Sequence, residues 1–432
     1  MNPAAIEGYL KWVLVQWMVI IAAAWIFGRL GQKLGQPLAV GEIFAGILLG
    51  PSGFGALWPD GFGQLFRLQT LPTMQTLAKV GIILLMFQVG MEFDFSHLRS
   101  RSRTVTAVSV LGIVAPALGG LLIGPWLHRH FVPEVNFVGF QLFICIALSI
   151  SALPIMGRIL LEMKLERTAL GALAISAAAI DDVIGWIGLA VATALVQSQF
   201  QWRTLLFQAG GVVALLLVLQ FAVGPALRRL WMRRASTSET PRLSANFLAL
   251  LLMVLFTCCL ATHWLGVFSI FGAFLCGVAL HQEASLVRAW REQFQGFVLV
   301  ALVPIFFTNT GLHTVIDSLD SGLAWLACAL VLLVAVAGKL GGCFLGALAT
   351  GQSTRDAGCI AALMNTRALM GLVAINVGLE LKLLNRELFT MFVIMALLTT
   401  VMAGPLLRWW LPKELRMPAA LGPREEPCGG PG

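Results

Sequence analysis

The sequence predicts an all-α polytopic membrane protein with about 13 transmembrane helices. Of its 432 residues, 58% are hydrophobic and only 12% are charged, and the mean hydropathy is +0.87. These values lie far from those of soluble domains. The apolar residues gather into runs, most of which are long enough to cross the roughly 30 Å hydrocarbon core of a bilayer as a helix.

Thirteen apolar runs can be counted along the chain. They lie at residues 10–28, 37–50, 73–91, 104–127, 137–160, 168–197, 204–226, 245–263, 265–281, 295–312, 322–349, 357–379 and 387–411. The second run is short, and we expect it to end near Gly50-Pro51. The widest polar connection extends from Arg228 to Ser244 and carries five arginines.

The basic residues predict the orientation of the chain. The net charge of +8 does not indicate a nucleic-acid partner, because most Lys and Arg lie in short clusters between apolar runs. Of the 29 Lys and Arg residues, 20 lie in the connections after the odd-numbered runs or in the C-terminal tail, whereas 6 lie on the opposite side. By the positive-inside rule, the N-terminus lies outside and the C-terminus in the cytoplasm, and we expect a cell (inner) membrane protein in contact with lipid.

The cysteines do not indicate a cofactor. Seven of the eight lie in apolar runs, and no CxxC pair or Cys/His ligand set occurs. We therefore interpret them as small apolar residues and expect neither disulfides nor a resident metal or other cofactor.

Two adjacent carboxylates, Asp181 and Asp182, lie in the middle of the sixth run. A charge at that depth costs at least ~2.5–3.5 kcal/mol, so two in a row indicate a function. Neighbouring residues on a helix point about 100° apart, so the two side chains cannot face the same partner. We expect one to meet a fixed positive group and the other to face a watery cavity. The alternative is a pair of structural acids held by hydrogen bonds.

Lys339 is a basic residue deep within the eleventh run, too far from either end to reach the interface easily. A buried ammonium is either paired or neutral. The sequence therefore predicts an ion pair, and we favour Asp181 as the partner of Lys339. A lysine that extends to the interface is the alternative.

Two runs are interrupted by polar residues or proline. In the fifth, Ser149 and Ser151 precede Pro154 and can satisfy the backbone groups that a proline leaves free. In the twelfth, Asn365, Thr366 and Arg367 stand together in an apolar run. Interrupted helices at matching positions in two halves of a chain indicate a binding site at the middle of the membrane. A proline kink and an arginine that reaches the interface are the alternatives.

A faint internal repeat relates the two halves. Ile43-Phe44-Ala45-Gly46 resembles Ile270-Phe271-Gly272-Ala273, and Gly90 matches Gly311. Seven runs separate each pair, so the halves would be inverted across the membrane, as in many transporters.

Several longer segments resemble the monovalent cation:proton antiporter-2 family, of the type with two aspartates. They are Gly35 to Pro51, Gly81 to Glu92, Ala179 to Val183, Pro304 to Leu312, Gly338-Lys339 and Asn365 to Arg367. The resemblance covers about Leu10 to Leu411. It implies a homodimer-forming scaffold and a transport core with two crossing broken helices.

The resemblance also implies roles for single residues. Asp182 would bind the transported cation, Na⁺ or K⁺, and the proton alternately, and Asp181 would pair with Lys339. Ser151 replaces the threonine of many relatives and keeps a hydroxyl at this position. The implied division is 1–103 scaffold, 104–200 core, 201–244 linker helix and basic loop, 245–320 scaffold, 321–411 core and 412–432 tail.

The leading functional hypothesis is a secondary antiporter that exchanges a monovalent cation, Na⁺ before K⁺, for protons by alternating access. A K⁺/H⁺ exchanger or an exporter of another small cation is the alternative. A cation channel is a different class and would conduct much faster. An intramembrane aspartyl protease fits poorly, because its acids would come from two facing helices, whereas Asp181 and Asp182 are adjacent on one.

Overall fold

A computed structural model describes residues 3–34, 36, 38–92, 102–163, 165, 168–197, 202–235, 242–266 and 269–411. All regular structure within these ranges is helical. Ten of the described helices are long and apolar enough to cross a membrane. Three shorter apolar helices at Phe137–Ser149, Ser269–Val278 and Met370–Glu380 correspond to the remaining runs. The predicted fold class is therefore confirmed, and the chain is a multi-pass membrane protein.

The helices follow the predicted runs in order. In the first half of the chain they are α1 (Pro3–Lys33), α2 (Leu38–Leu49), α3 (Phe54–Leu57), α4 (Pro59–Leu65), α5 (Leu71–Met91), α6 (Ser102–Phe131), α7 (Phe137–Ser149), α8 (Leu153–Glu162) and α9 (Ala169–Gln197). The linker consists of α10 (Trp202–Val218), the π-helical η2 (Leu219–Val223) and α11 (Gly224–Ala235). The second half contains α12 (Ala245–Trp264), α13 (Ser269–Val278), α14 (Ala284–Trp290), η3 (Arg291–Gln295), η4 (Val298–Leu302), α15 (Val303–His313), η5 (Ile316–Ser318), α16 (Gly322–Ala349), α17 (Thr354–Met364), α18 (Ala368–Glu380) and α19 (Arg386–Trp410).

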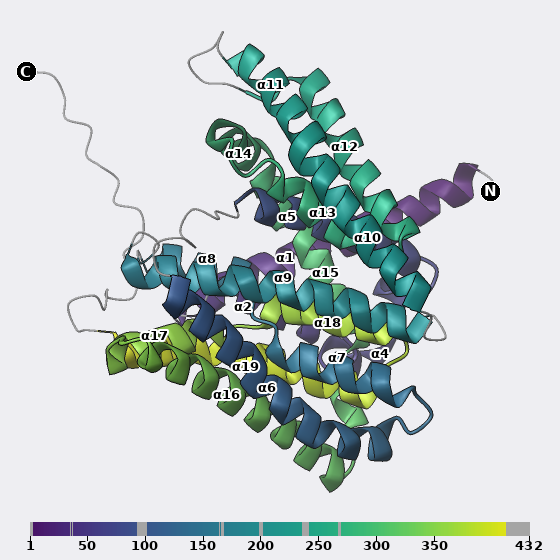
Figure 1. Ribbon diagram of the computed structural model, residues 1–432. Helices are drawn as coiled ribbons and strands as arrows, with labels where there is room; N and C mark the ends of the chain where they lie inside the picture. The colour runs from purple at the N-terminus through teal and green to yellow at the C-terminus, as the bar shows by residue number, and fades with distance from the viewer. Residues whose placement is uncertain are drawn as a thin grey trace, which may run out of the picture.

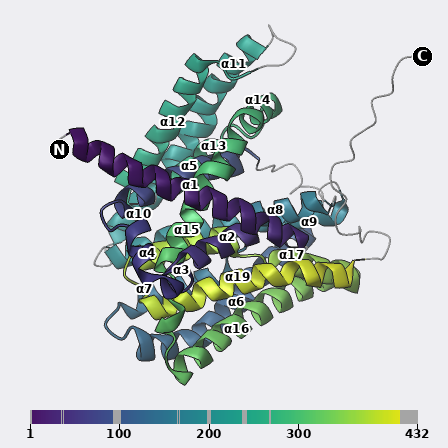
Figure 2. The same ribbon diagram turned by 180° about the vertical axis from the view of Figure 1, so that it is seen from behind.

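The helices form two groups that lie side by side (Figures 1 and 2). In one group α6 lies along α16, α7 and α9 pack against α6, and α19 packs against α16, α17 and α18. In the other, α1 packs against α2, α2 against α15, α5 against α13 and α15, and α12 against α13. Several pairings in the first half of the chain have counterparts in the second half: α1 with α2 corresponds to α12 with α13, and α6 with α9 corresponds to α16 with α19.

Two pairs of glycines show the repeat at residue level. Gly50, after α2, packs so closely on Gly311 of α15 that a Cβ on Gly50 would meet the Gly311 carbonyl oxygen. In the matching place, a Cβ on Gly90 of α5 would lie 3.1 Å from the Cα of Gly277 in α13. Gly50 and Gly277 are 227 positions apart, which is the offset between the two tetrapeptides noted above. Only glycine permits this approach of two backbones, so the inverted repeat fixes helix packing in both halves.

Several helices extend beyond their apolar runs. The sequence suggested that the polar connection begins at Arg228. The linker instead stays helical to Ala235, so Arg228, Arg229 and Arg233 lie on α11. The segment before α15 is also helical from Ala284, partly as the π-helical η3 and η4. Arginine and glutamate are good helix formers, so a helix does not end where its apolar run ends. The tail at 412–432 and the connection at 198–201 lie outside the described residues.

Candidate functional site

Two helices are broken in the middle of the first group. The break between α7 and α8 spans Ile150 to Ala152, and Ile150 is extended, with φ −61° and ψ 133°. Pro154 follows as the second residue of α8, where its missing N–H costs no helical hydrogen bond. The break between α17 and α18 spans Asn365 to Arg367. The two breaks touch, because the Ser151 hydroxyl lies 2.9 Å from the carbonyl oxygen of Met364.

Asp181 of α9 forms an ion pair with Lys339 of α16, and both side chains are fully buried. The Lys339 ammonium also donates to the carbonyl oxygen of Ser149 at 2.6 Å. The Ser151 hydroxyl lies 2.9 Å from the same Asp181 oxygen, Oδ2. The negative charge of Asp181 is thus compensated by a cation and a hydroxyl within one cluster.

Arg367 is fully buried and does not reach an interface. Its guanidinium donates to the carbonyl oxygen of Leu148 and, at 3.5 Å, to that of Ala147. A further bond of 2.9 Å joins its Nη2 to the carbonyl oxygen of Ala335 in α16. Together with Lys339 on the Ser149 carbonyl, two cations occupy the C-terminal end of α7, where the helix dipole favours positive charge.

The α17–α18 break is held mainly by polar groups of neighbouring helices. Thr366 donates to the carbonyl oxygen of Leu363 at 2.9 Å, and the Asn365 amide lies 3.4 Å from the carbonyl oxygen of Thr399. The Thr400 hydroxyl accepts hydrogen bonds from the backbone N–H groups at the start of α18. Sequence reasoning missed Thr400, although the pair Thr399-Thr400 inside an apolar run was an available signal.

Asp182 has a different environment from Asp181. Its side chain is 1% exposed, and neither carboxylate oxygen accepts a hydrogen bond of normal geometry from any described residue. The backbone N–H of Leu153, at the start of α8, faces this carboxylate. A small pocket at Asp182 is otherwise lined by apolar groups and an indole: Ile150, Trp186, Leu189, Met370 and Ala374. A carboxylate with free oxygens can accept either a proton or a hard cation.

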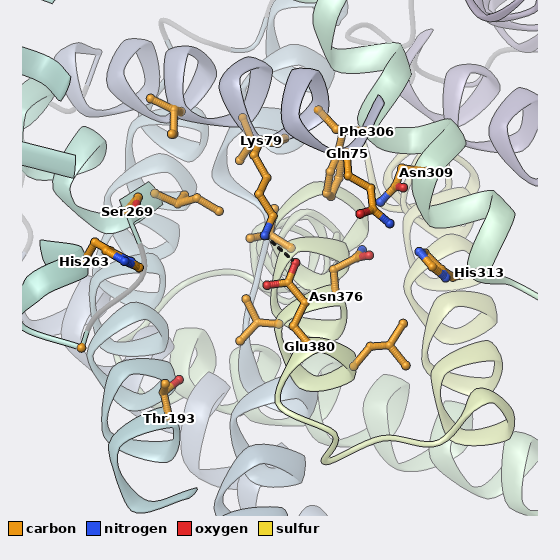
Figure 3. A pocket seen from close by; sticks show the side chains of 18 residues that line it. Gln75, Lys79, Thr193, His263, Ser269, Phe306, Asn309, His313, Asn376 and Glu380 are labelled. Carbon is orange, nitrogen blue, oxygen red and sulfur yellow. Dashed lines mark ion pairs between the residues drawn. The ribbon is translucent and has the colours of Figure 1, made fainter. Parts of the chain in front are cut away.

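A cavity of about 670 Å³ lies between the two helix groups (Figure 3). Its polar lining residues are Gln75, Lys79, Thr193, His263, Ser269, Asn309, His313, Asn376 and Glu380. Lys79 of α5 and Glu380 of α18 form an ion pair of 3.0 Å across it. Lys79 and Glu380 are 301 positions apart, and no local sequence pattern relates them.

The structure brings most of the predicted site residues together. Asp181, Lys339, Ser149 and Ser151 form one cluster, and Arg367 caps the same helix end. Ser151 contacts Asp181 and has no hydrogen bond to Asp182 among the described contacts. Asn365 and Thr366 support the second break and have no hydrogen bond to either aspartate among the described contacts.

Buried ionisable residues at the contact of two broken helices, within an inverted repeat, define an ion-coupled secondary membrane transporter. Comparison with known proteins agrees with this class. Residues 18–413 match the family described as sodium/hydrogen exchanger, transmembrane. The chain belongs to this family, and it is a cation/proton antiporter, not an enzyme.

Individual relatives support the assignment. The chain is 34% identical over 396 residues to the Na(+)/H(+) antiporter NhaS4 of Synechocystis sp., and covers 96% of that protein. It is 28% identical over 389 residues to the K(+)/H(+) antiporter 1 of Saccharomyces cerevisiae, but spans only 44% of its length. These matches cover 91% and 88% of the chain. The structure of the sodium proton antiporter MjNhaP1 from Methanocaldococcus jannaschii has the same fold, with a TM-score of 0.65 at 14% identity, covering 93% of this chain and 96% of that one.

Proposed function

We propose that the protein exchanges Na⁺, and as the alternative K⁺, for protons by alternating access, with Asp182 as the carrier group. The observation that carries the proposal is the contrast between the two aspartates. Asp181 is neutralised by Lys339, whereas the buried Asp182 carboxylate has no cationic or hydroxyl partner among the described residues and faces only the backbone N–H of Leu153. A buried unpaired carboxylate is unstable as an anion, so it favours one proton or one cation at a time.

The identity of the cation is the finer part of the proposal. A Na⁺/H⁺ antiporter and a K⁺/H⁺ antiporter both occur among the relatives, and the first is the more similar to this chain. The pocket at Asp182 offers a single carboxylate and mostly apolar neighbours. We therefore place Na⁺ first and K⁺ second. Proton flux driven in turn by Na⁺, K⁺ and Li⁺ in the same vesicles separates these cases.

Asp182→Asn tests the carrier role. Asparagine keeps the shape of the side chain but neither releases a proton nor balances a cation. In proteoliposomes we expect Asp182→Asn to abolish cation-driven proton flux, while the purified protein keeps its elution volume and helical signal. Asp317→Asn, which neutralises an exposed acid within η5, is the matched control and retains flux. Robust Na⁺- and K⁺-driven flux through Asp182→Asn contradicts the assignment.

The division into moving and static parts follows the two helix groups. We assign α6–α9 and α16–α19 to the transport core, and α1, α2, α5, α12, α13 and α15 to the scaffold. The sparse packing between the groups, compared with the packing inside each, supports this division. We further propose that the scaffold forms a homodimer within the lipid of the cell membrane. Cross-linking in native membranes measures the oligomer.

We propose an orientation with the N-terminus outside. The distribution of Lys and Arg supports it, because 20 of 29 fall on the side of the C-terminus. A reporter fused after Arg416 is then cytoplasmic, and one inserted at residues 200–202 is external. Both reporters on one side of the membrane would overturn this topology.

A further inference from the structure

The small pocket at Asp182 and the large cavity are lined by the same two helices, and on α9 they follow one another along the helix. On α9, Asp182, Trp186 and Leu189 line the pocket, and Thr193 lines the cavity. On α18, Met370 and Ala374 line the pocket, whereas Val373 and Val377, on a neighbouring face of the helix, line the cavity. The two hollows have no lining residue in common. The cavity therefore reaches the level of the pocket on α18, but Asp182 is not among its lining residues.

The barrier between the two hollows is short and apolar. Thr193 follows Leu189 by about one helical turn, a rise of about 6 Å along the helix axis. The rise from Asp182 to Thr193 along the same axis is about 16 Å. The pocket-lining side chains beyond Asp182 include Trp186, Leu189 and Met370, with relative exposures of 5%, 1% and 3%. A hydrated cation crosses an apolar constriction only if the constriction opens, because such a passage excludes water.

Trp186 is the largest side chain of this barrier and has two unusual features. Its indole packs against Phe271 of α13, with ring centroids 6.5 Å apart and planes tilted by 38°. This contact joins α9 of one helix group to α13 of the other. The indole N–H is buried and has no hydrogen-bond acceptor among the described residues. A buried donor without an acceptor is destabilising, so a movement that brings the indole N–H to water would relieve this cost.

We propose that Trp186 is the gate between the large cavity and Asp182. With its ring on Phe271, the indole closes the passage, and displacement of α9 relative to α13 separates the two rings and admits the cation. The inference rests on the proposed function in that it treats Asp182 as the carrier. In this proposal Trp186 controls the access of the cation to Asp182, which is a different role from binding the cation or stabilising the fold.

Cysteine accessibility tests the gate independently of transport. Ala374→Cys places a thiol on the pocket side of Trp186, and Val377→Cys places one in the large cavity. Each variant is treated with a membrane-impermeant methanethiosulfonate reagent in right-side-out and inside-out vesicles. The preparation that labels Val377→Cys identifies the side on which the cavity opens. The seven native cysteines that the structure describes are buried, and the parent protein supplies the background rate.

From that side we expect Ala374→Cys to react at least tenfold more slowly than Val377→Cys. Combination with Trp186→Ala should accelerate Ala374→Cys at least tenfold and leave Val377→Cys unchanged, which also shows that the double variant is folded. When Ala374→Cys is combined with Trp186→Phe, which keeps an aromatic ring, its labelling should stay slow. The same is expected with Ile187→Ala, which changes an exposed position on the same helix. If Trp186→Ala does not fold, Trp186→Leu takes its place.

Two results overturn the gate. The first is that Ala374→Cys and Val377→Cys are labelled equally fast when Trp186 is intact. The second is that Trp186→Ala does not change the labelling rate of Ala374→Cys. Loss of the proposed exchange activity has a different signature. If the wild-type protein moves no cation, the carrier assignment fails, while the labelling pattern still reports whether Trp186 closes the passage.

Discussion

Lys339 lies in an ion pair with Asp181, 158 positions away in the sequence, and neither side chain is exposed. The same ammonium donates to the carbonyl oxygen of Ser149 at the end of α7. One lysine therefore joins three helices, α16, α9 and α7, at the point where α7 is broken. Because Lys339 pairs with Asp181, the neighbouring Asp182 is left as the carboxylate without a cationic partner among the described residues.

A double-mutant cycle tests this pair. Lys339→Ala or Asp181→Asn alone leaves one buried group without its partner, which typically costs ~3–5 kcal/mol. Loss of both removes the charges together, and the pair itself contributes little after desolvation. We expect the double variant to be more stable than the sum of the two single changes predicts, as measured by thermal unfolding in one detergent. Additive effects would show that the two residues act independently.

Ser151 gives a second prediction. Its hydroxyl lies within hydrogen-bond distance of both Asp181 and the Met364 carbonyl, and so connects the two breaks. Ser151→Ala leaves these buried acceptors with one donor fewer, at an expected cost of about 1–3 kcal/mol, and should slow exchange. Ser151→Thr keeps the hydroxyl and should remain closer to the parent in both thermal stability and flux. If Ser151→Ala instead stays closer to the parent than Ser151→Thr does, the side-chain volume matters at this position and the hydroxyl does not.

The helices and the main ion pair were predictable from sequence for a simple reason. A long apolar run has few stable forms in a bilayer, and a charge within it requires a partner. The target of Arg367 was not predictable, because the Leu148 carbonyl is 219 positions away and every residue carries a carbonyl. The cap from Thr400 and the pairing of Lys79 with Glu380 likewise depend on how distant helices pack. Local sequence marks a polar group as unusual, but tertiary packing selects its partner.

Glu92, just after α5, gives a prediction on pH. Partial burial of this carboxyl, whose side chain is 38% exposed, raises its pKa, although Gln88, at 3.1 Å, and the Arg291 guanidinium, at 3.8 Å, oppose the shift. A raised pKa in the folded state means that the contribution to stability is complete below the unfolded pKa and is lost as the pH rises through the folded value. Glutamine does not ionise, so Glu92→Gln does not lose stability in this way as the pH rises. Its melting temperature should therefore increase relative to wild type as the pH rises from 4 to 8, in a series of buffers at about constant ionic strength.

The exposed Glu134→Gln is the control for Glu92, because it lies in a turn and removes the same charge. Its melting temperature should run parallel to that of the wild type over the series. A Glu92→Gln profile that also runs parallel would show that burial of Glu92 has no influence on stability.

The last prediction concerns Lys79 and Glu380, whose ion pair spans the large cavity between the two helix groups. The side chains are 61% and 48% exposed, so the pair contributes at most about 1 kcal/mol, and salt screens it. Because α5 and α18 belong to different groups, this small energy favours the arrangement of the groups seen here over any in which the cavity mouth is wider or narrower. A bias of about 1 kcal/mol changes the population of two states by roughly fivefold. Lys79→Glu places two acids opposite each other and should change the apparent KM for the cation by up to about that factor.

The reversed pair, Lys79→Glu with Glu380→Lys, restores the attraction and should return the apparent KM toward the wild-type value. Lys11→Glu reverses an exposed charge near the start of α1, on the side where α5 also begins, and serves as the control for a general change in surface potential. The effect of Lys79→Glu should shrink as choline chloride is added, because a pair exposed to solvent is screened while a purely steric change is not. A reversed pair that remains as impaired as Lys79→Glu alone, at low and high salt alike, would show that Lys79 acts through its shape or position and that the cavity mouth is not held by this ion pair.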